Sequence, residues 1–206
     1  MKEILQLMRK INEIFLSIQG EGCQTGVPSV FIRFAGCNLN CSFCDTKHQE
    51  GEMLSDDEII REVKKYKARQ IVLTGGEPSL FIDGDFIKRL KDETGLLIAI
   101  ETNGTNPLPE GIDWITVSPK EGMSECGETE VKVDRADEVK VVDIGQDLEP
   151  YFSLNCVGET TCMVLQPCSV DDPEKNRKNM QQTISRVLSD PRWRLSLQTH
   201  KFAGIR

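Results

Sequence analysis

This 206-residue sequence has no long apolar run, few histidines and no excess of positive charge. No run approaches the ~18 apolar residues of a membrane-spanning helix, and no charged-then-apolar signal segment opens the sequence. We therefore expect a cytoplasmic protein that does not bind a membrane. Two histidines are too few for a histidine-based metal centre. With 25 Lys and Arg against 33 Asp and Glu, the net charge of −8 argues against nucleic-acid binding and favours a small organic substrate.

The length is that of one domain, and we expect residues 1–206 to form it. A chain of this size can bury a real core but is shorter than the roughly 250 residues of a complete eight-fold barrel. We find no internal repeat and no low-complexity segment. Eight cysteines without an export signal favour a reducing compartment, in which thiols persist for metal binding.

Short apolar runs typical of strands alternate with helical patterns. The runs are residues 14–18, 30–34, 71–73, 96–100, 114–117, 138–142, 162–165 and 194–197. Helices are predicted over 55–65, where Ser55 and Glu58 form a capping box, over 81–91 and over 173–188. Strands joined by helical crossovers predict an α/β fold whose mainly parallel sheet curls into an incomplete, TIM-like barrel. Residues 119–137 are predicted to form a surface loop.

Three cysteines follow the second of these runs. Cys37, Cys41 and Cys44 have the spacing CxxxCxxC. A cubane cluster contains four irons, so three protein thiolates leave one iron open to a substrate or cofactor. The exit of a strand is also where α/β enzymes keep their chemistry. The alternative is a structural zinc site on the three cysteines and His48, which has the ligand number that zinc prefers.

A glycine motif at the end of the next run favours the cluster over zinc. Residues 70–73 lead directly into Thr74-Gly75-Gly76-Glu77-Pro78. Two glycines at a strand end let backbone groups approach a ligand closely, and Glu77 adds an acceptor for an ammonium group. Such a motif alone would usually form only a turn, so the combination with the cysteines is what is specific.

With both motifs in this order, the sequence resembles the radical S-adenosylmethionine enzymes and, among them, the family of 7-carboxy-7-deazaguanine synthases of queuosine and deazapurine biosynthesis. The segments that carry the resemblance are 15–22, 33–39, 44–46, 74–78, 101–104, 118–120, 165–167 and 198–201. The resemblance implies a carbon–nitrogen lyase with a [4Fe-4S] cluster, S-adenosylmethionine and Mg²⁺. Its reaction would contract 6-carboxy-5,6,7,8-tetrahydropterin to 7-carboxy-7-deazaguanine with loss of ammonia.

The resemblance also implies roles for individual residues. Cluster ligands would be Cys37, Cys41 and Cys44. Residues around S-adenosylmethionine would be Phe43, Asp45, Gly76, Glu77, Glu101, Ser118, Pro119, Lys120 and Gln166. Pterin-binding residues would be Ile18, Gln19, Gly20, Glu21, Arg33, Thr74, His200 and the terminal carboxylate of Arg206. Thr46 would hold Mg²⁺.

Four of these residues also have a physical argument. Arg33 is the one charge inside an apolar run, and its guanidinium can bind a carboxylate in a bidentate way, unless it reaches solvent at the strand end. Glu21 can accept from the amino and N–H groups of a pterin. Lys120 suits a carboxylate, the alternative being a solvated surface lysine. The single hydroxyl of Thr46 is a weak Mg²⁺ site, so the metal should bind well only with substrate.

We further expect the carboxyl-terminal residues 198–202 to belong to the active site, because polar groups and an aromatic replace the usual charged tail. The resemblance implies a homodimer and an electron donor such as flavodoxin or ferredoxin. Two other functions stay open: a glycyl-radical-enzyme activating protein of the same superfamily, and a non-catalytic iron–sulfur or zinc-binding module.

The remaining cysteines are less informative. Cys162 lies in a strand-like run, and we expect it to be a small buried apolar residue. An auxiliary cluster on Cys126, Cys156, Cys162 and Cys168 would lack CxxC-like spacing. Cys23 is given no role.

Overall fold

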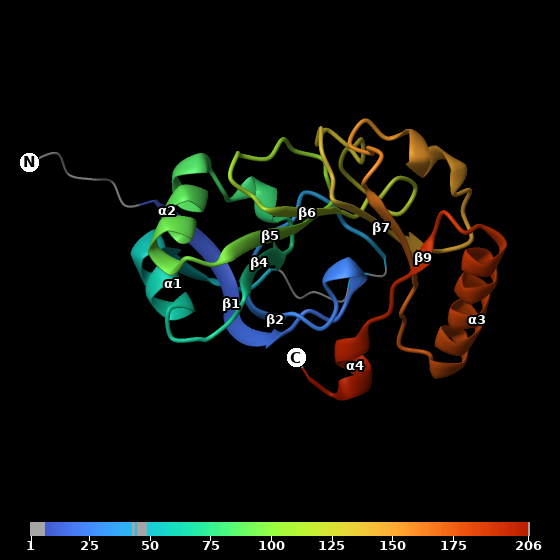
Figure 1. Ribbon diagram of the computed structural model, residues 1–206, viewed down its shortest axis with the longest axis horizontal. Helices are drawn as coiled ribbons and strands as arrows, with labels where there is room; N and C mark the ends of the chain where they lie inside the picture. The colour runs from blue at the N-terminus through green and yellow to red at the C-terminus, as the bar shows by residue number, and fades with distance from the viewer. Residues whose placement is uncertain (1–6, 43, 45–48, 206) are drawn as a thin grey trace, which may run out of the picture.

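A nine-stranded, mostly parallel sheet is the framework of the residues that the computed structural model describes, which are 7–42, 44 and 49–205 (Figure 1). In chain order its strands are β1 (Met8–Ile18), β2 (Pro28–Phe34), β3 (Glu52–Ser55), β4 (Gln70–Gly75), β5 (Leu97–Thr102), β6 (Trp114–Val117), β7 (Glu138–Asp143), β8 (Cys162–Pro167) and β9 (Arg194–Leu195). Across the sheet they lie in the order β3-β1-β2-β4-β5-β6-β7-β8-β9. β1 is antiparallel to both of its neighbours, and every later pairing is parallel. Within the described residues the sheet does not close, which confirms the predicted incomplete barrel.

Helices cover the two ends of this sheet. They are α1 (Asp56–Val63), α2 (Gly84–Thr94), α3 (Pro173–Ser189) and the short α4 (Thr199–Ala203), with three 3₁₀ turns, η1 (Gly22–Gln24), η2 (Pro78–Leu80) and η3 (Glu149–Ser153). α1 and α2 pack together at one end, whereas α3 packs on β8 and β9 at the other (Figure 1). No helix in the described part of the chain is long and apolar enough to span a membrane.

Side-chain caps fix where the helices begin. Before α1, the Ser55 Oγ accepts from the Glu58 N–H at 3.4 Å, and the Glu58 carboxylate accepts from the Ser55 N–H at 2.8 Å, so the predicted capping box is confirmed. α2 begins at Gly84, later than predicted, because Asp83 caps it by accepting from the Phe86 N–H at 2.9 Å.

The predicted strands are all present, but some bounds and contacts differ. β3 and α4 were not predicted, since four and five residues give too little periodicity to recognise, and β9 ends at Leu195. The predicted surface loop 119–137 has no helix or strand and is mostly exposed, but its side chains Met123 and Val133 are buried. Its few apolar residues follow no period that reveals this packing.

The expectation for Cys162 is wrong. The residue is half-buried at the start of β8, and a disulfide joins it to Cys23 of η1, which is 139 residues away in sequence. An apolar run predicts burial of the strand as a whole and says nothing of the partner of one terminal residue.

A buried cation fastens β1 to both helices at its end of the sheet. The Arg9 side chain is 3% exposed, and its guanidinium donates to Asp56 at 2.7 Å and to Asp83 at 2.9 Å. It also lies 4.0 Å from the centre of the Phe86 ring. Because Asp56 opens α1 and Asp83 caps α2, one side chain ties three elements together.

We predict that Arg9→Leu lowers the free energy of unfolding by about 3 kcal/mol, because Asp56 loses its close counter-ion inside the protein. Urea denaturation followed by circular dichroism measures the change. The control is Lys88→Ala, which removes an exposed ion pair with Asp92 and should leave the unfolding midpoint unchanged. Equal midpoints for Arg9→Leu and wild type would contradict the role given to Arg9.

Candidate active site

Two neighbouring cavities lie at the carboxyl ends of the parallel strands. The cysteine cavity, of about 240 Å³, is lined by Cys37, Cys41 and Cys44 together with the ends of β4 to β8. The aromatic cavity, of about 230 Å³, is lined by Phe15, Phe31 and the segments that follow β1 and β9. The residues that line both are Glu21, Thr74, Glu101, Lys140 and Gln198. The two cavities therefore share a wall.

The three predicted cluster ligands surround the cysteine cavity. Burial raises the pKa of the Cys37 and Cys41 thiols. A thiol binds iron as thiolate, so loading of this site releases protons. Among the described residues, no three His, Cys, Asp or Glu side chains are arranged to hold a metal ion. Three separate thiols that line one cavity fit a ligand larger than a single metal ion, as a cubane cluster is.

The glycine motif packs directly against the cysteine loop. The Gly76 N–H donates to Phe34 O at 3.1 Å, and the Glu77 N–H donates to Gly36 O at 2.9 Å. A Cβ on Gly75 would lie 2.2 Å from Phe34 O, and one on Gly76 would lie 1.9 Å from Gly36 O. No other residue fits at either position, which explains why the two glycines accompany the cysteines.

Side-chain amides hold the cysteine loop from the other side. The Asn38 Nδ2 donates to Thr105 Oγ1 at 2.8 Å, and its Oδ1 accepts from Asn103 Nδ2 at 3.0 Å. The segment after β6 adds a bridge between Ser124 and Cys41. The loop that carries the thiols is thus fixed by the residues that follow β5 and by the segment 119–137.

Glu77 points toward β5 and does not line either cavity. Its carboxylate accepts from Thr102 Oγ1 at 2.7 Å, from the Asn103 N–H at 2.7 Å and from the Ser79 N–H at 3.0 Å. With three donors on two oxygens, this buried carboxylate joins the exit of β4 to the exit of β5. Of the motif residues, those that line the cysteine cavity are Thr74, Gly75 and Gly76.

Three further predicted residues, Ser118, Lys120 and Gln166, line the cysteine cavity, whereas Pro119 does not. Burial lowers the pKa of Lys120 to about 8, although the Cys41 thiol opposes the shift. The Lys120 Nζ donates to the backbone oxygen of Ser118 at 2.7 Å. Lys120 is therefore a half-buried cation beside the cysteines and not the solvated surface lysine of the alternative interpretation.

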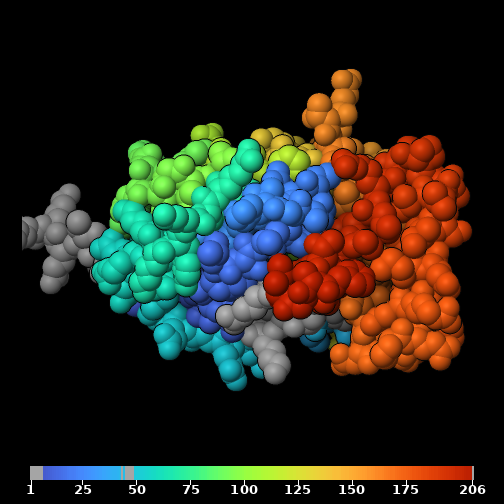
Figure 2. Space-filling view, turned by 60° about the horizontal axis from the view of Figure 1, so that its bottom comes forward, coloured from blue at the N-terminus to red at the C-terminus, as the bar shows by residue number. Residues whose placement is uncertain are grey.

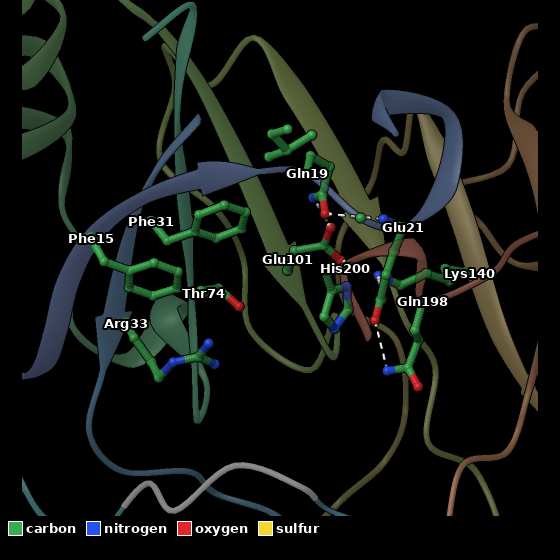
Figure 3. A pocket seen from close by; sticks show the side chains of 12 residues that line it. Phe15, Gln19, Glu21, Phe31, Arg33, Thr74, Glu101, Lys140, Gln198 and His200 are labelled. Atoms are coloured by element: carbon green, nitrogen blue, oxygen red, sulfur yellow. Dashed lines mark hydrogen bonds and ion pairs between the residues drawn. The ribbon is translucent and has the colours of Figure 1, made fainter. Parts of the chain in front are cut away.

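The aromatic cavity combines an apolar wall with polar groups (Figure 3). Phe15 and Phe31 stack with ring centres 5.1 Å apart and planes 11° apart. Arg33 and Thr74 are partners in the register of β2 and β4. The Arg33 Nε donates to Glu13 at 2.9 Å, so this charge has the partner that its place in an apolar run requires. Ile18, Gln19, Gly20 and His200 complete the predicted pterin residues in this wall.

A hydrogen-bonded network fills the wall between the cavities (Figure 3). The Lys140 Nζ donates to Glu21 at 2.7 Å and to Glu101 at 2.8 Å. The Gln19 amide donates to Glu101 at 3.1 Å, and the Gln198 amide donates to Glu21 at 2.8 Å. Five side chains from β5, β7 and the segments after β1 and β9 are joined in this way.

Burial and charge act against each other in this wall. Burial alone would raise the pKa of Glu21, but the Lys140 charge and its hydrogen bond, with one from Gln198, lower it to about 2. For Glu101, burial and the neighbouring Glu21 charge outweigh Lys140, and the pKa is raised. Burial, then the Glu101 charge, also raises the pKa of Glu138 to about 7. Of these three carboxylates, Glu21 consequently stays charged over the widest pH range.

The carboxyl-terminal segment lies against the segment that follows β1 (Figure 2). The Thr199 N–H and hydroxyl both donate to Gly20 O at 2.9 Å. A Cβ on Gly20 would lie 2.2 Å from His200 Nδ1, so only glycine leaves room for this histidine. Gln198 and His200 thereby become part of the aromatic cavity.

The structure brings most of the predicted site residues to these two cavities. The predicted Phe43, Asp45, Thr46 and Arg206, and His48 of the zinc alternative, lie outside the described residues. The sequence interpretation did not single out Phe15, Phe31 or Lys140, and it included Gln198 only within the segment 198–202. Lys140 carried the same signal as Arg33, a charge inside an apolar run, and Gln198 is close to His200.

Comparisons with known proteins agree with this geometry. The family model of the radical SAM superfamily matches residues 31–140. The 7-carboxy-7-deazaguanine synthase of Bacteroides thetaiotaomicron is 54% identical over 97% of this chain and 100% of its own length. That of Neisseria meningitidis is 37% identical over 95% of this chain and 93% of its own length. The crystal structure of QueE from Escherichia coli matches with a TM-score of 0.70 at 29% identity, covering 92% of this chain and 93% of that one.

We predict that Glu77→Gln lowers the free energy of unfolding by about 2 kcal/mol, because the new NH₂ group cannot accept from the donors that face it. Chemical denaturation of the protein without cluster measures the loss. Glu110→Gln, on an exposed turn, is the matched control and should behave as wild type. If both variants unfold at the wild-type midpoint, the Glu77 carboxylate does not join β4 to β5.

Proposed function

Because the chain belongs to the radical S-adenosylmethionine superfamily and, within it, to the family of 7-carboxy-7-deazaguanine synthases, we propose that its two cavities hold the two reactants of that reaction. The cysteine cavity holds the [4Fe-4S] cluster and S-adenosylmethionine that the superfamily uses. The aromatic cavity holds 6-carboxy-5,6,7,8-tetrahydropterin. The shared wall carries this proposal, because hydrogen transfer between two bound molecules requires that they lie next to each other.

When bound, the cluster and S-adenosylmethionine supply a 5′-deoxyadenosyl radical, and the protein positions and shields it. Cys37, Cys41 and Cys44 would be the cluster ligands. The backbone at Gly76 would receive the amino group of the cofactor. The other residues proposed around the cofactor are Phe43, Asp45, Glu77, Glu101, Ser118, Pro119, Lys120 and Gln166. Direct contact of Glu77 with the cofactor would require it to release donors that it now satisfies.

The aromatic cavity suits a flat heterocycle with one carboxylate. Phe15 and Phe31 offer an apolar wall, and the charged Glu21 accepts from the donor edge of the pterin. Arg33 would bind the carboxylate of the substrate. The other residues proposed to contact it are Ile18, Gln19, Gly20, Thr74, His200 and the terminal carboxylate of Arg206. These contacts orient the ring for contraction and loss of ammonia.

We also propose Mg²⁺ at Thr46, an electron donor such as flavodoxin or ferredoxin, a homodimer and a cytoplasmic location. The functions left open by the sequence are not favoured. A glycyl-radical activating protein or a non-catalytic module would not explain relatives that are named synthases over nearly the whole chain.

We predict that Cys37→Ala, Cys41→Ala and Cys44→Ala each reduce bound iron to background and abolish cleavage of S-adenosylmethionine, because two thiolates do not anchor the cubane. Iron content and visible absorbance after anaerobic reconstitution measure the first effect. Product formation from the carboxypterin with a reductant measures the second.

Cys126→Ala is the control for these variants. Cys126 is an exposed free cysteine that does not line the cysteine cavity, so iron and activity should remain at wild-type levels. Full iron content and turnover in Cys41→Ala would overturn the cluster assignment.

We predict that Mg²⁺ accelerates wild-type turnover and that Thr46→Ala weakens this response without changing cluster absorbance. The hydroxyl belongs to the metal and not to the cluster, and Mg²⁺ with few protein ligands depends on substrate oxygens. Turnover is measured with added Mg²⁺ and after chelation. Unchanged turnover of the wild type after complete chelation would remove the metal from the proposal.

A further inference from the structure

Lys140 is the cation at the centre of the wall between the two cavities, and none of the roles proposed above includes it. Its side chain is 8% exposed, and its Nζ lies 2.7 Å from Glu21 and 2.8 Å from Glu101. It lines both the cysteine cavity and the aromatic cavity (Figure 3). A buried ammonium in this position influences both ligand sites.

The hydrogen bonds around Lys140 form a closed ring. Lys140 donates to one oxygen of Glu101 and to one of Glu21. The other Glu101 oxygen accepts from the side-chain amide of Gln19 at 3.1 Å. The side-chain oxygen of the same amide accepts from the Glu21 backbone N–H at 3.2 Å. Rotation of either carboxylate would break the ring at Lys140. The Gln198 side-chain amide donates to the second Glu21 oxygen at 2.8 Å, and this bond links the carboxyl-terminal segment to the same ring.

The ring is also a balance of charge. Two carboxylates and one ammonium are buried together. Without the cation, the two negative charges, which both lie within hydrogen-bond distance of Lys140, would repel each other. The other titratable groups whose charges act on this trio are Glu138 on β7, Lys120 after β6 and His200 on α4. The pKa of Lys140 is raised, because Glu101 and Glu21 outweigh the effect of burial, which lowers it. Lys140 therefore keeps its charge while both carboxylates are ionised.

We propose that Lys140 is a positioning residue of the synthase: its ammonium keeps Glu21 ionised and oriented toward the donor edge of the pterin, and it fixes Glu101 at the boundary with the cofactor. The proposal rests on the proposed function. Lys140 acts through the two carboxylates. In each of them one oxygen accepts from Lys140 and the other accepts from a side-chain amide. Its loss should affect substrate binding and the pH dependence of the reaction more than the cluster.

The test compares wild type with Lys140→Met, which has a side chain of similar length without the charge, and with Lys140→Arg. We expect Lys140→Met to raise the KM for the carboxypterin ~10-fold or more, while cluster absorbance and cleavage of S-adenosylmethionine without product persist. Calorimetric binding of the carboxypterin, with S-adenosylmethionine present and no reductant, should weaken similarly. Lys140→Arg should restore part of both losses because it restores the charge.

The pH profile separates this role from simple packing. Without the ammonium, the pKa of Glu21 rises from about 2, since burial, which raises it, remains. Binding needs ionised Glu21, so kcat/KM of Lys140→Met should fall at a pH ~2 units higher than in wild type as the solution is acidified. Glu138 has a pKa of about 7, and loss of the Lys140 charge raises it further, so its titration stays apart from the acid limb that reports on Glu21. Lys132→Met, at an exposed ion pair with Glu128, should match wild type.

Should Lys140→Met not fold, Glu101→Gln with and without Lys140→Met gives the same comparison with one like charge removed. The kcat/KM of the double variant should fall at a higher pH on acidification than that of Glu101→Gln alone. An unchanged KM and an unchanged acid limb on loss of Lys140 would overturn the inference while wild-type turnover sustains the proposed function. Wild type that neither binds nor converts the carboxypterin would overturn both.

Discussion

Close backbone packing between the ends of β2 and β4 is the constraint on which the site depends. The parallel register places Phe34 beside Gly75, and a Cβ on Gly75 would lie 2.2 Å from Phe34 O. The next residue, Gly76, is equally close to Gly36, from which the chain enters the cysteine loop. Because both contacts exclude side chains, the cysteines and the glycine motif are held on the same cavity. The contacts proposed for the cluster and the cofactor in the cysteine cavity therefore depend on this close packing of the two strand ends.

The second determinant is a group of buried charges that is stable only as a whole. Lys140 of β7 lies between two carboxylates. Glu21 belongs to the segment that follows β1, and Glu101 belongs to β5. A buried carboxylate without a cation would bind a proton at neutral pH. The ionisation of the wall between the cavities thus depends on correct folding of strands that are far apart in sequence.

The open sheet gives the carboxyl-terminal segment its place. Because β9 ends after two residues and no described strand pairs beyond it, the chain turns back across the strand ends toward Gly20. His200 and Gln198 then complete a cavity that β1 and β2 leave open. A closed barrel would need the two edge strands of the sheet to pair with each other. In the open sheet of the described residues, the terminal segment lies where that closure would be.

The sequence by itself determined the alternation of strands and helices, the capping box at Ser55, and the chemistry implied by CxxxCxxC and the glycine motif, because these depend on local spacing. It also indicated Arg33, as a charge within an apolar run. Only the tertiary structure decided the bond between Cys23 and Cys162, the burial of Met123 and Val133 in the loop 119–137, and the partners of Lys140. These contacts join residues up to 139 positions apart, and no local pattern encodes which distant side chain a charge or thiol will meet.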